Sequence, residues 1–100
     1  MMSLAGVPAV YYNSMMAAPN NLEGLAQTGR NRTINRKKWS VEEAHQHFSD
    51  PVGAPVRVLR GIQRLVAERR LHAAFHPESL QQCLSVDPRI FALLRHCQRT

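Results

Sequence analysis

The stretch GVPAVYY, at residues 6–12, decides how this 100-residue chain is expected to fold. Its β-branched and aromatic residues follow a glycine in one short apolar run, which is typical of a strand buried in a parallel sheet. Pro8 cannot donate a backbone hydrogen bond, but it stands near the start of the run, where a strand tolerates proline. Residues 7–12 are therefore predicted to form a buried strand.

Residues 13–40, which follow this strand, sustain no hydrophobic period. The segment is rich in Asn, Gly, Thr and Arg, which favour irregular structure. A structureless loop longer than about 15 residues is usually functional or disordered. We therefore expect a long loop here.

Two helices are predicted after the loop. Ser40 can cap the first free amides of a helix over residues 41–49, and Glu43 at the third position completes a capping box. A second helix is predicted over residues 55–71, where apolar residues recur at helical spacing and arginines face away. We expect its apolar stripe to pack in a core; the stripe comprises Val58, Leu59, Ile62, Leu65 and Val66.

The end of the chain is predicted to form a β-hairpin over residues 82–96. Two apolar runs flank Asp87-Pro88-Arg89, and proline suits the second position of a tight turn. A two-stranded hairpin is only marginally stable in water unless it packs on something. The hairpin is therefore expected to need a neighbour.

The composition is that of an ordinary globular protein with an excess of positive charge. Thirteen Lys and Arg residues stand against seven Asp and Glu residues, which gives a formal charge of +6. Two cysteines are too few for a disulfide framework, so a reducing cytoplasm is the expected location. We expect no membrane partner, because no run approaches the roughly 20 apolar residues of a membrane span and the apolar start lacks the basic region of a signal peptide.

The histidines and cysteines do not predict a metal site. His72 and His76 have the i, i+4 spacing of a zinc pair on a helix, but Pro77 ends that segment and no HExxH carboxylate accompanies them. No Ser-His-Asp or Cys-His nucleophile motif is present either. We expect no metal and no cofactor.

Three segments, in this order, resemble a known enzyme family. GVPAVYY at residues 6–12 resembles the "GxPxxYY" eighth barrel strand of the α-amylase family, glycoside hydrolase family 13. TGRNRTINR at residues 28–36 resembles the "GRDINR" stretch of sucrose phosphorylase and its relatives, and ERRLHAAFHP at residues 68–77 is similar to the exit of the last barrel helix. The resemblance covers about residues 5–96.

The resemblance implies an α/β fold, namely the last βα unit of a (β/α)8 TIM barrel followed by the first hairpin of a C-terminal β-domain. Residues 1–75 are expected to end the barrel and residues 76–100 to begin the β-domain. As an isolated fragment the chain is expected to be mainly helical and at best partly ordered, with the helix from Val56 to Leu71 the most persistent element.

The chemistry that the resemblance implies is a retaining transfer of a glucosyl group to inorganic phosphate. Such chemistry needs two carboxyl groups about 5 to 5.5 Å apart, and in the family they come from barrel strands that these residues do not include. We therefore expect no catalytic residue here and no activity of the fragment alone. The parent is expected to bind a glucoside and phosphate, with fructose, a fructose phosphate or glycerate left open as the acceptor.

The resemblance places substrate-binding residues at the strand end and in the loop, because barrel active sites lie at the C-terminal ends of the strands. The family's subsite arginine aligns with Arg32, with Arg30 as the alternative, and Tyr12 and Asn13 complete the expected set. Tyr11 and Tyr12 are more often barrel packing than sugar contacts, because alternate residues of a barrel strand point into the core and toward the helices. The loop lacks the acidic residue that many family hydrolases carry after the tyrosines, and one residue is inserted before Asn31.

Two alternatives stay open at this point. The chain can be interpreted as a small basic protein that binds nucleic acid through its arginine-rich loop and helix face, although this explains only the charge. It can also complement a separately encoded N-terminal barrel portion, which would cover the exposed apolar strand and stripe.

Overall fold

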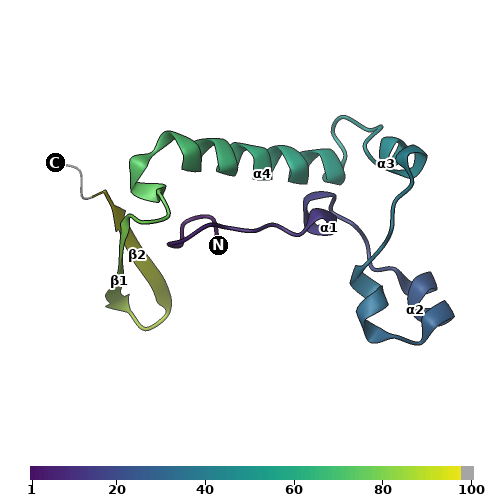
Figure 1. The fold of residues 1–100 in the computed structure, drawn as a ribbon, viewed down its shortest axis with the longest axis horizontal. Coiled ribbons are helices and arrows are strands. Elements are labelled where there is room, and N and C mark those ends of the chain that lie inside the picture. The colour runs from purple at the N-terminus through teal and green to yellow at the C-terminus, as the bar shows by residue number, and fades with distance from the viewer. Residues whose placement is uncertain (98–100) are drawn as a thin grey trace. The chain divides into compact units, whose positions relative to one another are not determined.

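The computed structural model describes residues 1–97, shown in Figure 1. Its elements, in chain order, are α1 (Tyr12–Met15), α2 (Leu22–Thr28), the 3-10 helix η1 (Asn31–Asn35), α3 (Val41–His47), α4 (Ala54–Leu71), the 3-10 helix η2 (Ala73–Phe75), β1 (Leu80–Asp87) and β2 (Ile90–His96). The chain divides into two compact units, one of Val10–Ile62 and one of Met1–Ala9 with the chain from Gln63 onward.

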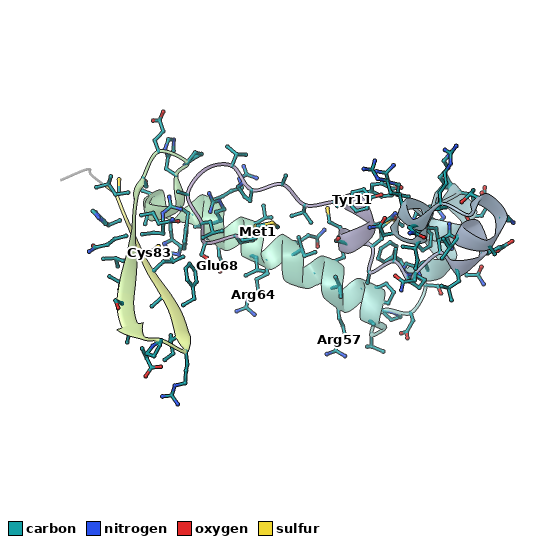
Figure 2. All side chains as sticks on the ribbon, turned by 90° about the horizontal axis from the view of Figure 1, so that it is seen from below. Met1, Tyr11, Arg57, Arg64, Glu68 and Cys83 are labelled. Atoms are coloured by element: carbon teal, nitrogen blue, oxygen red, sulfur yellow. The ribbon has the colours of Figure 1, made fainter. Side chains whose placement is uncertain are left out.

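Helix α4 confirms the helix predicted over residues 55–71. Pro55 lies in its first turn, where the missing amide proton is not needed, and Arg69 and Arg70 lie in its last turn, where cations favour the helix dipole. Arg57 and Arg64 project from the same side of the helix (Figure 2). The local sequence therefore accounts for both ends of this helix.

Helix α3 begins as its capping box predicts. Glu43 N donates to Ser40 Oγ at 3.1 Å, and Ser40 N donates to Glu43 Oε2 at 2.9 Å. Two amides that the helix leaves without partners are thereby satisfied. The helix ends at His47, two residues before the predicted end at residue 49.

The predicted hairpin is also present. Strands β1 and β2 pair antiparallel, with Leu80 opposite His96 and Leu84 opposite Ala92. The pairing is irregular between Leu84 and Asp87, just before the turn. In the turn, Arg89 Nε lies 2.9 Å from Asp87 Oδ1, so an ion pair closes the loop between the strands.

The structure differs from the prediction at residues 7–12. Residues 7–11 form neither strand nor helix, and Tyr12 begins α1. A strand requires a neighbour that accepts and donates backbone hydrogen bonds, and the sheet found in residues 1–97 contains only β1 and β2. The apolar run therefore lacks the pairing that would make it a barrel strand.

The expected long loop, residues 13–40, contains more local structure than its sequence period indicated. Asn21 caps α2 by accepting a hydrogen bond from Gly24 N at 3.0 Å, and Gly29 ends α2 with a left-handed φ of 63°. The Thr28 and Thr33 hydroxyls lie 2.9 Å apart and join α2 to η1. Caps and turns, rather than an apolar stripe, thus organise this segment.

A buried arginine organises the unit that contains the hairpin. Arg95 is 9 % exposed. Its guanidinium donates to the carbonyl oxygens of His76 at 2.9 Å and Ser3 at 3.1 Å, and also to those of Ser79 and Leu80. A planar group with five donors suits several carbonyls at once. Arg95 therefore ties the N-terminal residues to the start of the hairpin.

No apolar side chain is buried anywhere in the described residues, 1–97. The stripe of α4, which the sequence placed in a core, is only partly covered: Leu65 is 53 % exposed and Val58 is 37 % exposed, whereas Leu59 and Ile62 are half-buried. Within the same residues, none of the helices has the length and apolar character needed to cross a membrane. Within these residues no side chain of the stripe is fully buried, so its packing in a core stays a prediction for a larger protein.

The capping box generates a prediction of pH dependence. The hydrogen bond from Ser40 N lowers the pKa of Glu43, and Lys37 nearby acts in the same direction. The Glu43 carboxyl group ionises more readily in the folded helix than in the unfolded chain. Its contribution to helix stability is therefore present above its pKa in the unfolded chain and is lost as the pH falls through its pKa in the folded helix.

We therefore expect helix content, measured by far-UV circular dichroism, to fall on acidification below the usual range of a glutamate carboxyl. The Glu43→Gln variant keeps a capping side chain that does not titrate, so its helix content should fall less. An equal loss of helix content in both proteins would contradict the role given to the Glu43 carboxylate in the capping box.

Candidate functional site

The candidate site is built on Asn13, whose side chain is 5 % exposed. Trp39 Nε1 donates to Asn13 Oδ1 at 2.7 Å, and Asn13 Nδ2 donates to the Lys37 carbonyl oxygen at 3.0 Å. Longer contacts of 3.4 Å join the same nitrogen to the Asn35 carbonyl and the Tyr11 hydroxyl. This one amide therefore links the turn at α1 to the chain that follows η1.

Trp39 connects this link to α3. The Lys37 ammonium lies 4.1 Å from the centre of the Trp39 ring and 3.7 Å from Glu43 Oε1. The His47 ring packs against Trp39 at a tilt of 47°, with ring centroids 4.6 Å apart, and its Nε2 lies 2.7 Å from the Met16 carbonyl oxygen. Cation–π and ring contacts of this kind stabilise by about 0.5–1.5 kcal/mol each. They fix the position of residues 37–39.

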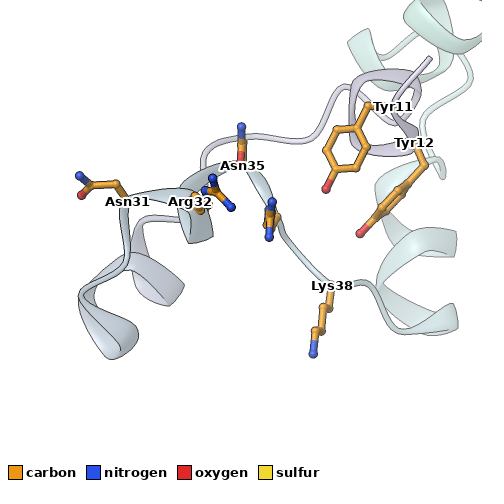
Figure 3. Close-up of a pocket in the computed structure, with 7 residues that line it drawn as sticks. Tyr11, Tyr12, Asn31, Arg32, Asn35 and Lys38 are labelled. Atoms are coloured by element: carbon orange, nitrogen blue, oxygen red, sulfur yellow. The ribbon is translucent and has the colours of Figure 1, made fainter. Parts of the chain in front are cut away.

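A surface pocket opens beside this network (Figure 3). It is lined by Tyr11, Tyr12, Asn31, Arg32, Asn35, Arg36 and Lys38. The two tyrosine rings meet edge to face with centroids 5.0 Å apart. Every lining side chain offers hydrogen-bond donors, and none of them is a carboxylic acid. The pocket can therefore hold a polar or anionic molecule but cannot supply a catalytic carboxylate.

No ion pair in the described residues involves the cations of the pocket. Ion pairs within residues 1–97 join Lys37 to Glu43, His72 to Glu68 and Arg89 to Asp87. The side chains of Arg32, Arg36 and Lys38 take part in none of these pairs. The pocket therefore concentrates three positive charges, in contact with solvent.

Two of the predicted site residues, Arg32 and Tyr12, come together in the pocket. The other two do not line it: Arg30 is the residue before η1, and Asn13 is an interior residue whose side-chain bonds are all internal. Arg36 and Lys38 belong to the basic loop that the nucleic-acid alternative uses, but the resemblance assigns them no role. Tyr11, for which the sequence favours barrel packing over sugar contact, also lines the pocket.

The described residues contain no group of three or more His, Cys, Asp or Glu side chains that could hold a metal ion. His72 lies 3.6 Å from Glu68, one helical turn away, which accounts for its position without a metal. The polar pocket is therefore the main candidate for function in this part of the chain.

Comparison with known proteins gives relatives of one kind. The chain is 40 % identical over 95 residues, 95 % of its length, to a glucosylglycerate phosphorylase from Spirochaeta thermophila. It is 35 % identical over 79 residues to a glucosylglycerate phosphorylase from Escherichia coli and 36 % identical over 70 residues to a sucrose phosphorylase from Streptococcus mutans, 79 % and 70 % of its length.

The chain spans between about one eighth and one sixth of the length of these relatives: 16 %, 14 % and 13 %, respectively. No family model matches the chain. No solved structure matches it either.

The buried amide predicts a local effect that can be measured. Replacing Asn13 by Leu keeps the side-chain size but leaves the Trp39 indole N–H and the Lys37 carbonyl without this partner. An unsatisfied buried polar group costs about 1–3 kcal/mol, so the region around Trp39 should open.

Trp39, the chain's one tryptophan, should then fluoresce at longer wavelength in the Asn13→Leu variant than in the unaltered chain. Asn20→Leu, at an exposed position of the same segment, is the matched control and should leave the emission in place. Identical spectra for both variants would contradict the role given to Asn13.

Proposed function

Since this chain belongs by sequence to the sugar phosphorylases, we propose that residues 1–100 supply the substrate-facing C-terminal end of a catalytic barrel and the start of a C-terminal β-domain. The enzyme of which they form a part transfers a glucosyl group from a glucoside to inorganic phosphate. The observation that carries the proposal is the similarity over 95 % of the chain to a glucosylglycerate phosphorylase, at 40 % identity. A barrel of the α-amylase family is part of this proposal.

The proposed reaction proceeds by two displacements. A carboxylate attacks the anomeric carbon while a carboxylic acid gives its proton to the leaving oxygen, and phosphate oxygen then displaces the carboxylate and passes its proton back. Neither carboxyl group is expected among these residues, since none lines the pocket. The role of this chain is therefore to bind and orient, and residues 1–100 are expected to be inactive alone.

Arg32 is the residue that we propose to contact substrate. Its side chain lines the pocket together with Tyr12 (Figure 3). A guanidinium offers a planar fork of donors that suits both sugar hydroxyls and a carboxylate from another part of the enzyme. Arg32 would thus close one end of the glucose subsite. Arg30, which does not line the pocket, is the weaker candidate.

The exposed apolar surface supports the proposal that these residues pack on the remainder of a phosphorylase, either within one polypeptide or as a separate chain. We place the protein in the cytoplasm, in keeping with its two cysteines. The alternative of a nucleic-acid-binding protein rests on net charge alone, whereas the phosphorylase assignment rests on residue-by-residue similarity.

The proposal predicts activity only in a complete enzyme. Residues 1–100 alone, given sucrose or glucosylglycerate with phosphate, should release no glucose 1-phosphate. A chimera in which they replace the corresponding segment of the Spirochaeta thermophila relative should release it from glucosylglycerate.

Within the chimera, Arg32→Lys keeps the charge but loses the fork, so kcat/KM should fall about ten- to hundred-fold, equivalent to about 1.5–3 kcal/mol. Arg57→Lys on α4 is the matched control and should be neutral. Activity of the isolated chain, or a folded chimera without activity, would contradict the proposal.

A further inference from the structure

The pocket beside Asn13 concentrates positive charge that the structure does not neutralise. Arg32, Arg36 and Lys38 line it, and among residues 1–97 no side-chain hydrogen bond and no ion pair engages their charged groups. Three like charges at one surface repel one another, and an anion bound among them offsets this repulsion. We infer that this pocket binds a small oxyanion, with Arg36 and Lys38 as its principal anchors.

Other basic side chains of the chain are engaged by the protein itself. Arg95 and Arg69 donate to backbone carbonyls, and Arg89 pairs with Asp87. Lys37, between the two anchors in sequence, lies against Trp39 and near Glu43. The pocket cations differ because their donors remain available to a ligand. Arg57 and Arg64 are also exposed, but they stand on α4 and do not line the pocket.

The backbone that carries the anchors is held from two sides. The Lys37 carbonyl oxygen accepts from Asn13 Nδ2 at 3.0 Å and from the Tyr12 hydroxyl at 2.9 Å. Arg36 and Lys38 flank this doubly bonded residue, so their backbone positions are set before a ligand arrives. Preorganisation of this kind raises affinity because less freedom is lost on binding.

The hydroxyl groups of Tyr11 and Tyr12 indicate which further polar groups a ligand of this pocket would carry. The Tyr11 hydroxyl accepts from Asn13 Nδ2 at 3.4 Å, so its own proton is available to a ligand. The Tyr12 hydroxyl gives its proton to Lys37 and keeps lone pairs that can accept. A ligand with hydroxyl groups next to its negative charge would satisfy both rings. The pocket therefore fits an oxyanion that bears hydroxyl groups or oxygen donors, such as a hydroxy acid or phosphate.

This inference rests on the proposed function and narrows its substrate class. In a phosphorylase, the oxyanion is either the attacking phosphate or the carboxylate of an acidic acceptor such as glycerate. A neutral acceptor such as fructose carries no charge for Arg36 and Lys38 to bind. The shared chemistry is an oxyanion held by guanidinium and ammonium groups, and the two sources can be separated by direct binding.

The test is a calorimetric titration, at constant ionic strength, of the chimera in which these residues replace the corresponding segment of the Spirochaeta thermophila relative, because the isolated chain is not expected to fold cooperatively. Inorganic phosphate, glycerate and neutral glycerol are titrated separately, with chloride keeping the ionic strength fixed. We expect phosphate, glycerate or both to saturate, whereas glycerol has no effect. Saturation by phosphate alone assigns the pocket to phosphate, and saturation by glycerate alone assigns it to the acceptor.

Two double variants carry the same loss of charge. Arg36→Gln with Lys38→Gln should weaken oxyanion binding about tenfold or more, because charge-assisted bonds are lost. Arg57→Gln with Arg64→Gln should leave it unchanged. The inference is overturned if neither oxyanion saturates, if glycerol binds as well, or if the α4 variant weakens binding equally. Because binding is measured without turnover, its failure is distinct from an inactive chimera.

Discussion

The side-chain amide of Asn13 is the interaction on which residues 10–62 depend. It is buried, and both its oxygen and its nitrogen have partners in the chain after η1. A buried amide without partners is costly, so its environment must form as a set. Trp39 and the Lys37 carbonyl bond to it directly, Tyr12 donates to the same carbonyl, and Arg36 and Lys38 flank Lys37. Polar contacts, rather than an apolar core, thus organise this segment.

The absence of a buried apolar residue in the described chain has an energetic consequence. Full burial of a Leu, Val or Phe side chain contributes about 1.5–3 kcal/mol to stability. Val7 is 82 % exposed and Phe91 is 75 % exposed, and three residues of the α4 stripe, Val58, Leu65 and Val66, are exposed as well. Without that contribution, hydrogen bonds of Asn13 and Arg95 must oppose the conformational entropy of the chain. Surfaces of this kind suit residues that pack on a larger protein.

Local signals in the sequence correctly predicted the elements whose structure is set by residues close to them in the sequence. The capping box at Ser40, the stripe of α4 and the turn at Pro88 each specify structure within a few residues. The prediction differed from the structure where the fold depends on distant partners. Residues 7–12 have a strand sequence but no strand beside them in residues 1–97, and α2 and η1 depend on caps at Asn21 and Gly29 rather than on a period.

The residues of the candidate site could likewise be predicted only in part from the sequence. A resemblance pointed to Arg32 and Tyr12, and both line the pocket, whereas Asn13 proved to be an interior link. Arg36 and Lys38 could not be assigned from spacing, because their availability depends on which basic residues the fold engages elsewhere.

The most direct test of the account is scanning calorimetry of the purified 100-residue chain. The account predicts a broad trace without a cooperative peak, and a sharp two-state transition of about 60–80 kcal/mol, as for an ordinary domain of this size, would contradict it.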